Sequence, residues 1–380
     1  MNRLIFIDNI KVFGNLIRCM IHAAVPYMVT YSAMWPFDDK GSYLFDFSIF
    51  EGHLFLMELF FILTGFMFAM QMKRKSSKEI IKNRLKKIVF PFILGLILIM
   101  PIVLSFFELS DYNSYDWMTF EGLKTAYLKG WQVGLANLFP TGHLWFLYYL
   151  IYFYVFSFIL YKKLPKLLTF LERIPIWTFI AIPIIVSITM MFFMKRWLVD
   201  NPLTFIPELP TLTHYYLFFF IGVLLFYSEK IQQSLNAIWK KLVWTGGIIG
   251  VIAIFPQLIF ENQLHSHYGL IKTGAIILHM IATYFLALGI WTGFKLLSVK
   301  HRKRIVYLSD ANYWIYISFL PVAMFIQLLL LPFDIPVYFK FLLTYVLGLS
   351  FCLFLYEFSI RYTWVGGVLN NKRIRSKRQN

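Results

Sequence analysis

Ten long apolar stretches constrain this sequence more than any other feature. A transmembrane helix needs about 20 mostly apolar residues, and these stretches are continuous rather than alternating, which argues against transmembrane β-strands. They cover roughly residues 10–33, 48–72, 88–107, 142–161, 176–194, 211–228, 241–260, 270–297, 305–331 and 336–360. The sequence therefore predicts an all-α, polytopic integral membrane protein with about ten transmembrane helices.

Composition excludes the main soluble classes. The 380 residues are 59% hydrophobic and 14% charged, whereas a soluble domain is about 45–50% apolar and about 25% charged, and disorder needs low hydrophobicity. The net charge of +17 fits either nucleic-acid binding or cytoplasmic loops, and the small soluble surface favours the loops. We therefore expect no nucleic-acid partner. Cys19 and Cys352 have neither disulfide nor metal-ligand spacing, so we also expect no metal.

The distribution of basic residues predicts the orientation in the membrane. With the N-terminus in the cytoplasm, most of the 36 Lys and Arg residues fall in cytoplasmic segments, as the positive-inside rule requires. Both termini are then cytoplasmic in a plasma (inner) membrane, and the first apolar run is too long for a cleaved signal peptide. We expect one membrane domain over residues 1–365, a basic tail over 366–380, and a small outer cap with interfacial helices within 108–141.

Four polar residues follow one face of the first predicted helix. Asn15, Arg18 and His22 lie 4, 7 and 11 residues after Lys11, which at about 100° per residue places all four within about 60° of one another. At about 1.5 Å per residue, His22 lies roughly 16 Å from Lys11 along the axis. Ionisable residues inside a span are costly and are functional candidates, although a packing helix with a snorkelling cation would explain Lys11.

His22 is the candidate catalytic base of this stripe. A neutral imidazole can take a proton from a hydroxyl at physiological pH, since its ordinary pKa is about 6.5. The cationic stripe could also lead an anionic substrate from Lys11, at the cytoplasmic boundary, past Arg18 to His22. We therefore expect catalytic roles for His22 and Arg18, with a purely structural stripe as the alternative.

The second and third spans carry three more charged candidates. Glu58 lies near the expected depth of His22, so it could pair with Arg18 or orient His22, or it could form an ion pair that only joins two helices. Arg84 and Lys87 lie three residues apart at the cytoplasmic entrance of the third span. Cations there can bind phosphates, but they also obey the positive-inside rule.

The starts of the fourth and ninth spans carry other polar residues. His143 and Trp145 are candidates for contact with a polar acceptor, although Trp at a membrane boundary is ordinary. Ser309 is expected to cap the ninth span, and His214 and His279 are expected to be hydrogen-bonded residues of the bundle. The sequence has no Gly-rich phosphate loop, catalytic serine elbow or zinc pattern.

Several of these segments together resemble membrane acyltransferase family 3, whose members O-acylate bacterial surface and periplasmic carbohydrates. The matching residues are Asp8, Lys11 with His22, Phe60-Phe61 with Thr64-Gly65-Phe66, Arg84 with Lys86-Lys87 and Pro91, and Leu308-Ser309-Asp310-Ala311-Asn312-Tyr313 with Tyr316. The resemblance covers residues 5 to 365. Gly142-His143-Leu144-Trp145 and the stretch from Arg361 to Gly367 look most like the succinyltransferase branch that includes glucan biosynthesis protein C.

The chain departs from the family pattern at three places. Lys11 stands where Arg is usual, and Thr64 stands where Ser is more common. The histidine of the family's terminal Tyr-x-x-Tyr-Leu-x-x-His stretch is replaced between Tyr313 and Pro321. The first two changes are conservative, whereas the third removes a polar side chain that the family has there.

The resemblance implies an enzyme that moves an acyl group from a cytoplasmic acyl-CoA to a hydroxyl of an extracytoplasmic carbohydrate, such as a periplasmic glucan. Acyl-CoA would be a co-substrate rather than a bound cofactor. Its phosphates would bind near Lys11, Arg84 and Lys87.

The resemblance also implies roles at the other end of the donor. The thioester would reach His22 as general base, and Arg18 would donate to the developing oxyanion. The acceptor would enter from outside, past His143 and Trp145. Two other classes stay open: a transporter or flippase for a glycan or acylated precursor, although we find no inverted repeats, and a structural scaffold for glycan assembly.

Overall fold

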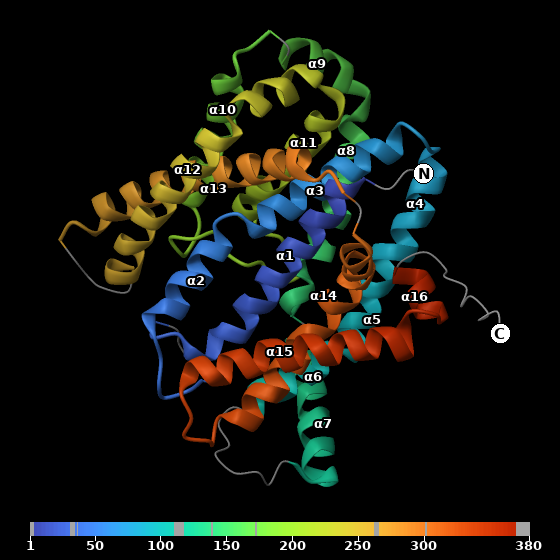
Figure 1. The fold of residues 1–380 in the computed structure, drawn as a ribbon, viewed down its shortest axis with the longest axis vertical. Helices are drawn as coiled ribbons and strands as arrows, with labels where there is room; N and C mark the ends of the chain where they lie inside the picture. Colours follow the sequence, from blue (N-terminus) through green and yellow to red (C-terminus); the bar gives the residue numbers. More distant parts are fainter. Residues whose placement is uncertain are drawn as a thin grey trace.

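The computed structural model describes residues 4–30, 35, 37–109, 118–137, 140–171, 173–261, 266–300 and 302–369, and every regular element within them is helical (Figure 1). The elements are α1 (Ile5–Ala24), η1 (Val25–Tyr27), α2 (Tyr43–His53), α3 (Leu56–Met72), α4 (Ser77–Arg84), η2 (Leu85–Val89), α5 (Phe90–Leu98), α6 (Met100–Leu109), α7 (Phe120–Ala136), η4 (Gly142–Leu144), α8 (Trp145–Leu160), η5 (Tyr161–Lys163), α9 (Leu164–Leu171), α10 (Ile176–Met191), α11 (Leu209–Tyr227), α12 (Glu229–Phe260), α13 (Tyr268–Leu297), α14 (Lys303–Leu330), α15 (Val337–Leu355), η6 (Tyr356–Ile360) and α16 (Trp364–Leu369). The chain is therefore all-α in the part that the structure describes, as the sequence predicts.

Eight helical stretches in the described residues are long and apolar enough to cross a membrane. They are Tyr43–Met72, Ser77–Leu109, Gly142–Leu160, Leu209–Tyr227, Glu229–Phe260, Tyr268–Leu297, Lys303–Leu330 and Val337–Ile360. The pair α9 and α10, bent by 120°, brings a ninth if it is counted as one span. These nine correspond to nine of the ten predicted stretches, so the protein is a multi-pass membrane protein.

The remaining predicted stretch, the first in the sequence, corresponds to α1, and its predicted bounds need correction. The prediction began at residue 10 and ended at 33, whereas the helix covers Ile5–Ala24 and turns at Pro26 into a short 3₁₀ segment. Proline lacks the amide hydrogen that would continue the α-helix. Asp8, Lys11 and Arg18 make α1 less apolar than the other spans, yet α1 packs against α2, α3, α13, α14 and α15, so it lies inside the bundle (Figure 1).

A close helix crossing explains one glycine of the family motif. A Cβ atom on Gly65 of α3 would lie 1.8 Å from the carbonyl oxygen of Phe219 in α11, and one on Gly222 of α11 would lie 2.1 Å from that of Ile62 in α3. Neither position can hold a larger residue without moving a backbone. Small residues bring membrane helices together in this way, so Gly65 has a packing role.

The expected cap is present in part. Within 108–141, α7 packs along α6, and Gly130 permits this contact because a Cβ atom there would lie 2.2 Å from the Pro101 carbonyl oxygen. Residues 110–117 lie outside the described part. At the other end of the chain, α16 continues the bundle to Leu369, so residues 366–369 do not belong to the predicted tail, and residues 370–380 are not described.

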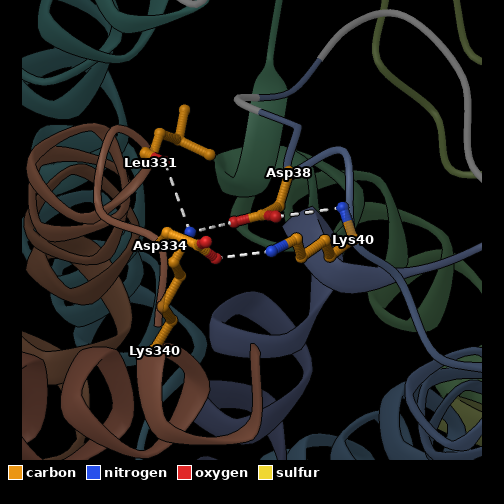
Figure 2. A network of polar contacts seen from close by, with 5 residues as sticks. All are labelled: Asp38, Lys40, Leu331, Asp334 and Lys340. Atoms are coloured by element: carbon orange, nitrogen blue, oxygen red, sulfur yellow. Dashed lines mark hydrogen bonds and ion pairs between the residues drawn. The ribbon is translucent and has the colours of Figure 1, made fainter. Parts of the chain in front are cut away.

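A network of ion pairs joins the α1–α2 connection to the turn between α14 and α15 (Figure 2). Lys340 of α15 donates to Asp38 at 2.5 Å and to the Leu331 carbonyl at 3.3 Å. Only 3% of Lys340 and 2% of Asp38 are exposed. Lys40 and Asp334 form a second pair at 2.5 Å that is largely exposed. The network fixes the end of the bundle that we expect to face outside.

Candidate functional site

A cavity of about 730 Å³ follows the polar face of α1. Leu4, Ile7, Lys11, Asn15 and Arg18 line it at helical spacing, and the other walls come from α3, α4, η2, α8, α14 and α16. From Leu4 to Arg18 the helix rises about 21 Å. The structure thus places three of the four stripe residues, Lys11, Asn15 and Arg18, on a common cavity.

Cations gather where the third predicted span meets this cavity. Lys11, Arg84 and Lys87 all line it. The Arg84 guanidinium lies over the Tyr154 ring at 4.7 Å, and its Nε atom is buried without a hydrogen-bond partner in the described residues. The resemblance implied that these three cations bind the donor phosphates together, and all three line this one cavity.

A local irregularity of the backbone presents Arg84 and Lys87 to the cavity. Residues Leu85–Val89 form a π-helical turn directly before Pro91. Such turns are rare and often occur at functional sites. Pro91 has no amide hydrogen for the Lys87 carbonyl four residues earlier, and the Tyr313 hydroxyl donates to that carbonyl at 2.7 Å instead. The turn is therefore fixed by a side chain from α14.

Ser309 does not have the predicted role. It was expected to cap a helix, but α14 begins six residues earlier, at Lys303. The Ser309 hydroxyl instead donates to Asp8 Oδ1 at 2.6 Å, and both residues line the cavity with Asp310. This bond joins the first and last motifs of the sequence, which lie 301 residues apart.

Arg18 is the last residue of α1 that lines the cavity, and Tyr316, Phe60 and Phe146 line the cavity as well. Only 6% of Arg18 is exposed. Its guanidinium donates to Asn15 Oδ1 at 2.7 and 3.2 Å and to the carbonyls of Ile315 and Tyr316 at 3.1 and 3.4 Å. No Asp or Glu of the described residues forms an ion pair with it. A buried cation held only by neutral oxygens can still attract negative charge.

His22 lies one helical turn beyond Arg18 and does not line the cavity. Its ring stacks on Trp35, with centroids 6.0 Å apart and planes 4° apart. Trp35 Nε1 donates to Gln327 Oε1 at 3.0 Å, and Gln327 Nε2 donates to the His22 carbonyl at 2.9 Å. The imidazole therefore lies behind Arg18, covered by Trp35, and it has no side-chain hydrogen bond to another described residue.

The expected partners of Glu58 are wrong. Glu58 Oε1 lies 3.2 Å from Nε2 of His214 rather than beside Arg18 or His22. His214 Nδ1 in turn lies 3.0 Å from Ser187 Oγ, and that hydroxyl lies 2.8 Å from the hydroxyl of Tyr284. The sequence did not predict which helix the Glu58 side chain faces. This buried chain also confirms that His214 is hydrogen-bonded, whereas both ring nitrogens of His279 are buried without a partner in the described residues.

His143 and Trp145 have different surroundings. His143 follows Gly142, whose φ of 49° suits a residue without a side chain, and its Nε2 lies 3.1 Å from the Ile317 carbonyl. Trp145 is 6% exposed and packs against the rings of Phe61 and Tyr215. Neither residue lines the cavity, and Trp145 belongs to the aromatic core.

The sequence reasoning missed four residues that shape the site. Tyr313 and Tyr316 were recognised only as parts of a motif, although Tyr316 lies under the Arg18 guanidinium at 5.1 Å. Trp35 and Gln327 cover His22 and were not singled out. A polar Gln in the middle of a predicted span was the one available signal for Gln327, whereas nothing in the sequence places Trp35 against His22.

The arrangement can bind an elongated anionic molecule with its charge at the Lys11, Arg84 and Lys87 end. The described residues contain no group of three or more His, Cys, Asp or Glu side chains that could hold a metal ion. Arg18 offers donors at the other end, and two imidazoles lie nearby without lining the cavity. Such an arrangement suits acyl transfer from a charged donor.

Comparison with known proteins gives the family. A family model described as an acyltransferase domain matches residues 4–357, nearly the whole chain. No curated protein and no solved structure matches the chain significantly. Because the match covers far more than half of the sequence and the fold is a bundle of membrane-length helices, the chain belongs to this acyltransferase family and is a multi-pass membrane acyltransferase.

Proposed function

We propose that the protein transfers an acyl group from a cytoplasmic acyl-CoA to a hydroxyl of an extracytoplasmic carbohydrate, in the plasma (inner) membrane. One observation carries this proposal: one cavity has cations at one end and, at the other, a buried arginine that has no carboxylate partner among the described residues. The sequence resemblance favours a glucan as the acceptor and succinyl as the acyl group. The family membership supports the reaction class, and the donor and acceptor are part of the proposal.

The cavity suits the shape and charge of a CoA thioester. Its volume of about 730 Å³ lies in the usual range of small-molecule sites, about 300–1,000 Å³. The phosphates would bind Lys11, Arg84 and Lys87, since Arg in particular matches phosphate oxygens. The narrow pantetheine arm would then follow the apolar wall between Met57 and Leu150.

The reaction would take place at the Arg18 end. The thioester carbonyl would accept a hydrogen bond from Arg18, which can stabilise the negative oxygen of the tetrahedral intermediate. In this proposal His22, one turn further along α1, is the general base for the acceptor hydroxyl. The acceptor would approach from the His143 side of the bundle. Glu58 has no direct part, because it contacts His214.

The direct experiment measures release of the free CoA thiol by the purified protein. Succinyl-CoA and acetyl-CoA are compared, each with and without glucan oligosaccharides, for the wild type and for His22→Ala. We expect acceptor-dependent thiol release that falls by about 10²-fold or more in the variant. Unchanged release in the variant would remove His22 as the base, and no release with any donor would favour a transporter or flippase.

A second measurement tests the donor end. Arg84→Gln and Lys87→Gln should each weaken CoA binding severalfold, because each removes one charge from the phosphate site. Lys86→Gln is the matched control, since Lys86 lies on the same turn but is exposed and does not line the cavity. If all three variants bound CoA as tightly as the wild type, Arg84 and Lys87 would be determinants of membrane orientation only.

A further inference from the structure

We propose that His143, in place of His22, is the general base of the acyl-transfer site and takes the proton of the acceptor hydroxyl beside Arg18. The inference rests on the proposed acyl transfer and adds one residue to it. A contact of one ring nitrogen of this residue determines which nitrogen can accept a proton. A base of this kind needs one ring nitrogen held by another group and the other nitrogen free for the substrate proton. His143 meets both conditions.

A proline in α14 creates the group that holds His143. Pro321 lies inside the helix and has no amide hydrogen to give to the Ile317 carbonyl four residues earlier. His143 Nε2 lies 3.1 Å from that carbonyl oxygen. A carbonyl oxygen can only accept, so Nε2 carries the hydrogen and Nδ1 keeps its lone pair. The tautomer of His143 is therefore set by Pro321.

The other ring nitrogen, Nδ1, is enclosed by the protein and does not face the cavity. His143 Nδ1 is a buried atom without a hydrogen-bond partner in the described residues. A buried polar atom normally has a partner, so an acceptor hydroxyl that approaches Nδ1 satisfies it. His22 differs, because its ring is held by stacking on Trp35 and no hydrogen bond to a described residue selects its tautomer.

His143 and Arg18 are held by consecutive carbonyls of α14. Arg18 donates to the carbonyls of Ile315 and Tyr316, and His143 donates to the carbonyl of Ile317. Tyr316 also joins the two residues: its ring lies 5.1 Å from the Arg18 guanidinium and 6.1 Å from the His143 ring. Its hydroxyl donates to the His143 carbonyl at 2.6 Å. The oxyanion donor and the imidazole therefore share one support.

The same device occurs a second time at this site. Pro91 leaves the Lys87 carbonyl without its helical donor, and the Tyr313 hydroxyl takes that carbonyl at 2.7 Å. Tyr313 lines the cavity. In both cases a proline inside a membrane helix frees a carbonyl, and a polar side chain at the site is fixed by it.

The step balances without a further reactant. The acceptor hydroxyl gives its proton to Nδ1 of His143 while its oxygen bonds to the thioester carbonyl carbon, and the carbonyl electrons move to the oxygen facing Arg18. When the carbon–oxygen double bond re-forms, the carbon–sulfur bond breaks. The CoA thiolate then takes the proton from Nδ1, which leaves an ester, free CoA thiol and a neutral imidazole.

The test uses the full-length protein and the donor and acceptor that give the fastest thiol release. His143→Gln keeps an amide hydrogen that can reach the Ile317 carbonyl but removes the proton-accepting nitrogen, and His22→Gln is the matched variant of the other histidine. We expect His143→Gln to lower kcat by about 10²-fold or more, with little change in KM for acyl-CoA. We also expect added imidazole to restore part of the activity of His143→Ala, which a structural role would not explain.

A kcat for His143→Gln close to the wild-type value would overturn this inference while leaving the proposed function intact. A wild-type protein that releases no thiol would overturn the proposed function itself. Pro321→Ala provides a second route if the histidine variants fold poorly. It retains both histidines and returns the amide hydrogen that competes for the Ile317 carbonyl, so we expect kcat to fall about tenfold without loss of thermal stability. An unchanged kcat in this variant would also contradict the proposal.

Discussion

Arg18 and Lys340 are both cations buried inside the helical bundle, but their surroundings differ. Lys340, 3% exposed, forms an ion pair with Asp38 at 2.5 Å (Figure 2). Arg18, 6% exposed, is held by Asn15 and by main-chain carbonyls and ends a cavity. The first site neutralises its own charge, whereas the second keeps a positive charge that faces the cavity.

This difference separates a structural cation from a functional one. Removing one partner of a buried ion pair leaves the other charge without compensation, so such a pair is sensitive to mutation but has nothing to offer a ligand. A cation with only neutral partners has less to lose on mutation and more to offer to negative charge that develops beside it. Burial alone would have placed Arg18 and Lys340 in the same class.

The largest effect is expected at Lys340. Lys340→Met leaves the Asp38 carboxylate buried without its counter-charge, and we expect the free energy of unfolding to fall by about 3–5 kcal/mol. Denaturant unfolding of the purified protein in detergent, followed by tryptophan fluorescence, measures this loss. Acyl transfer per folded molecule should not change, because neither residue lines the cavity.

The control for this prediction removes both charges. Lys340→Met combined with Asp38→Leu fills the same space with apolar atoms and should recover most of the lost stability, since an apolar pair often replaces a buried ion pair without cost. If the double variant were as unstable as Lys340→Met alone, the network in Figure 2 would stabilise the protein through something other than charge pairing.

The second largest effect is expected at Arg18, where a substitution should reduce activity rather than stability. Arg18→Gln can keep a hydrogen bond to the carbonyls of α14 but loses the charge, so we expect kcat to fall by about 10²–10³-fold. The midpoint of unfolding should change much less than in Lys340→Met, because a buried charge is removed together with its desolvation cost. Thiol release and thermal unfolding, measured on the same preparation, check both parts.

Two outcomes would contradict this view of Arg18. A normal kcat would show that the guanidinium only joins α1 to α14. A loss of stability as large as that of Lys340→Met would place both cations in the structural class, and the comparison between them would fail.

Sequence periodicity predicted the axis of the site better than its contacts. The spacing of Lys11, Asn15 and Arg18 along one helix fixes their common face, and the cavity follows that face. The spacing also put His22 on this face, yet His22 does not line the cavity, whose last lining residue on α1 is Arg18, one turn earlier. Helical geometry sets directions along one helix and does not say where another helix fills the space.

Contacts between helices were the part that the sequence could not supply. Glu58 was expected beside Arg18 or His22, but its partner is His214, because α3 packs closely on α11 through Gly65 and Gly222. Depth follows from counting residues, whereas the facing helix follows from packing of the whole bundle. The contact between His143 and the Ile317 carbonyl also depends on the packing of the bundle, so it could not be predicted even though Pro321 is visible in the sequence.

The smallest effect is expected at the exposed pair of the same network, Lys40 and Asp334. The Lys40 ammonium holds the pKa of Asp334 below its usual value, and the carboxylate raises the pKa of Lys40. The stabilisation from this pair is therefore present between the ordinary pKa values of Asp and Lys, about 3.9 and 10.4. It is lost as the pH falls through the lowered pKa of Asp334, and it is lost again as the pH rises through the raised pKa of Lys40.

Lys40→Gln should consequently lower the unfolding midpoint only slightly at neutral pH, and this difference should vanish at high salt, which screens exposed charges. A difference that persists in high salt and equals that of Lys340→Met would mean that exposure does not separate the two pairs of the network.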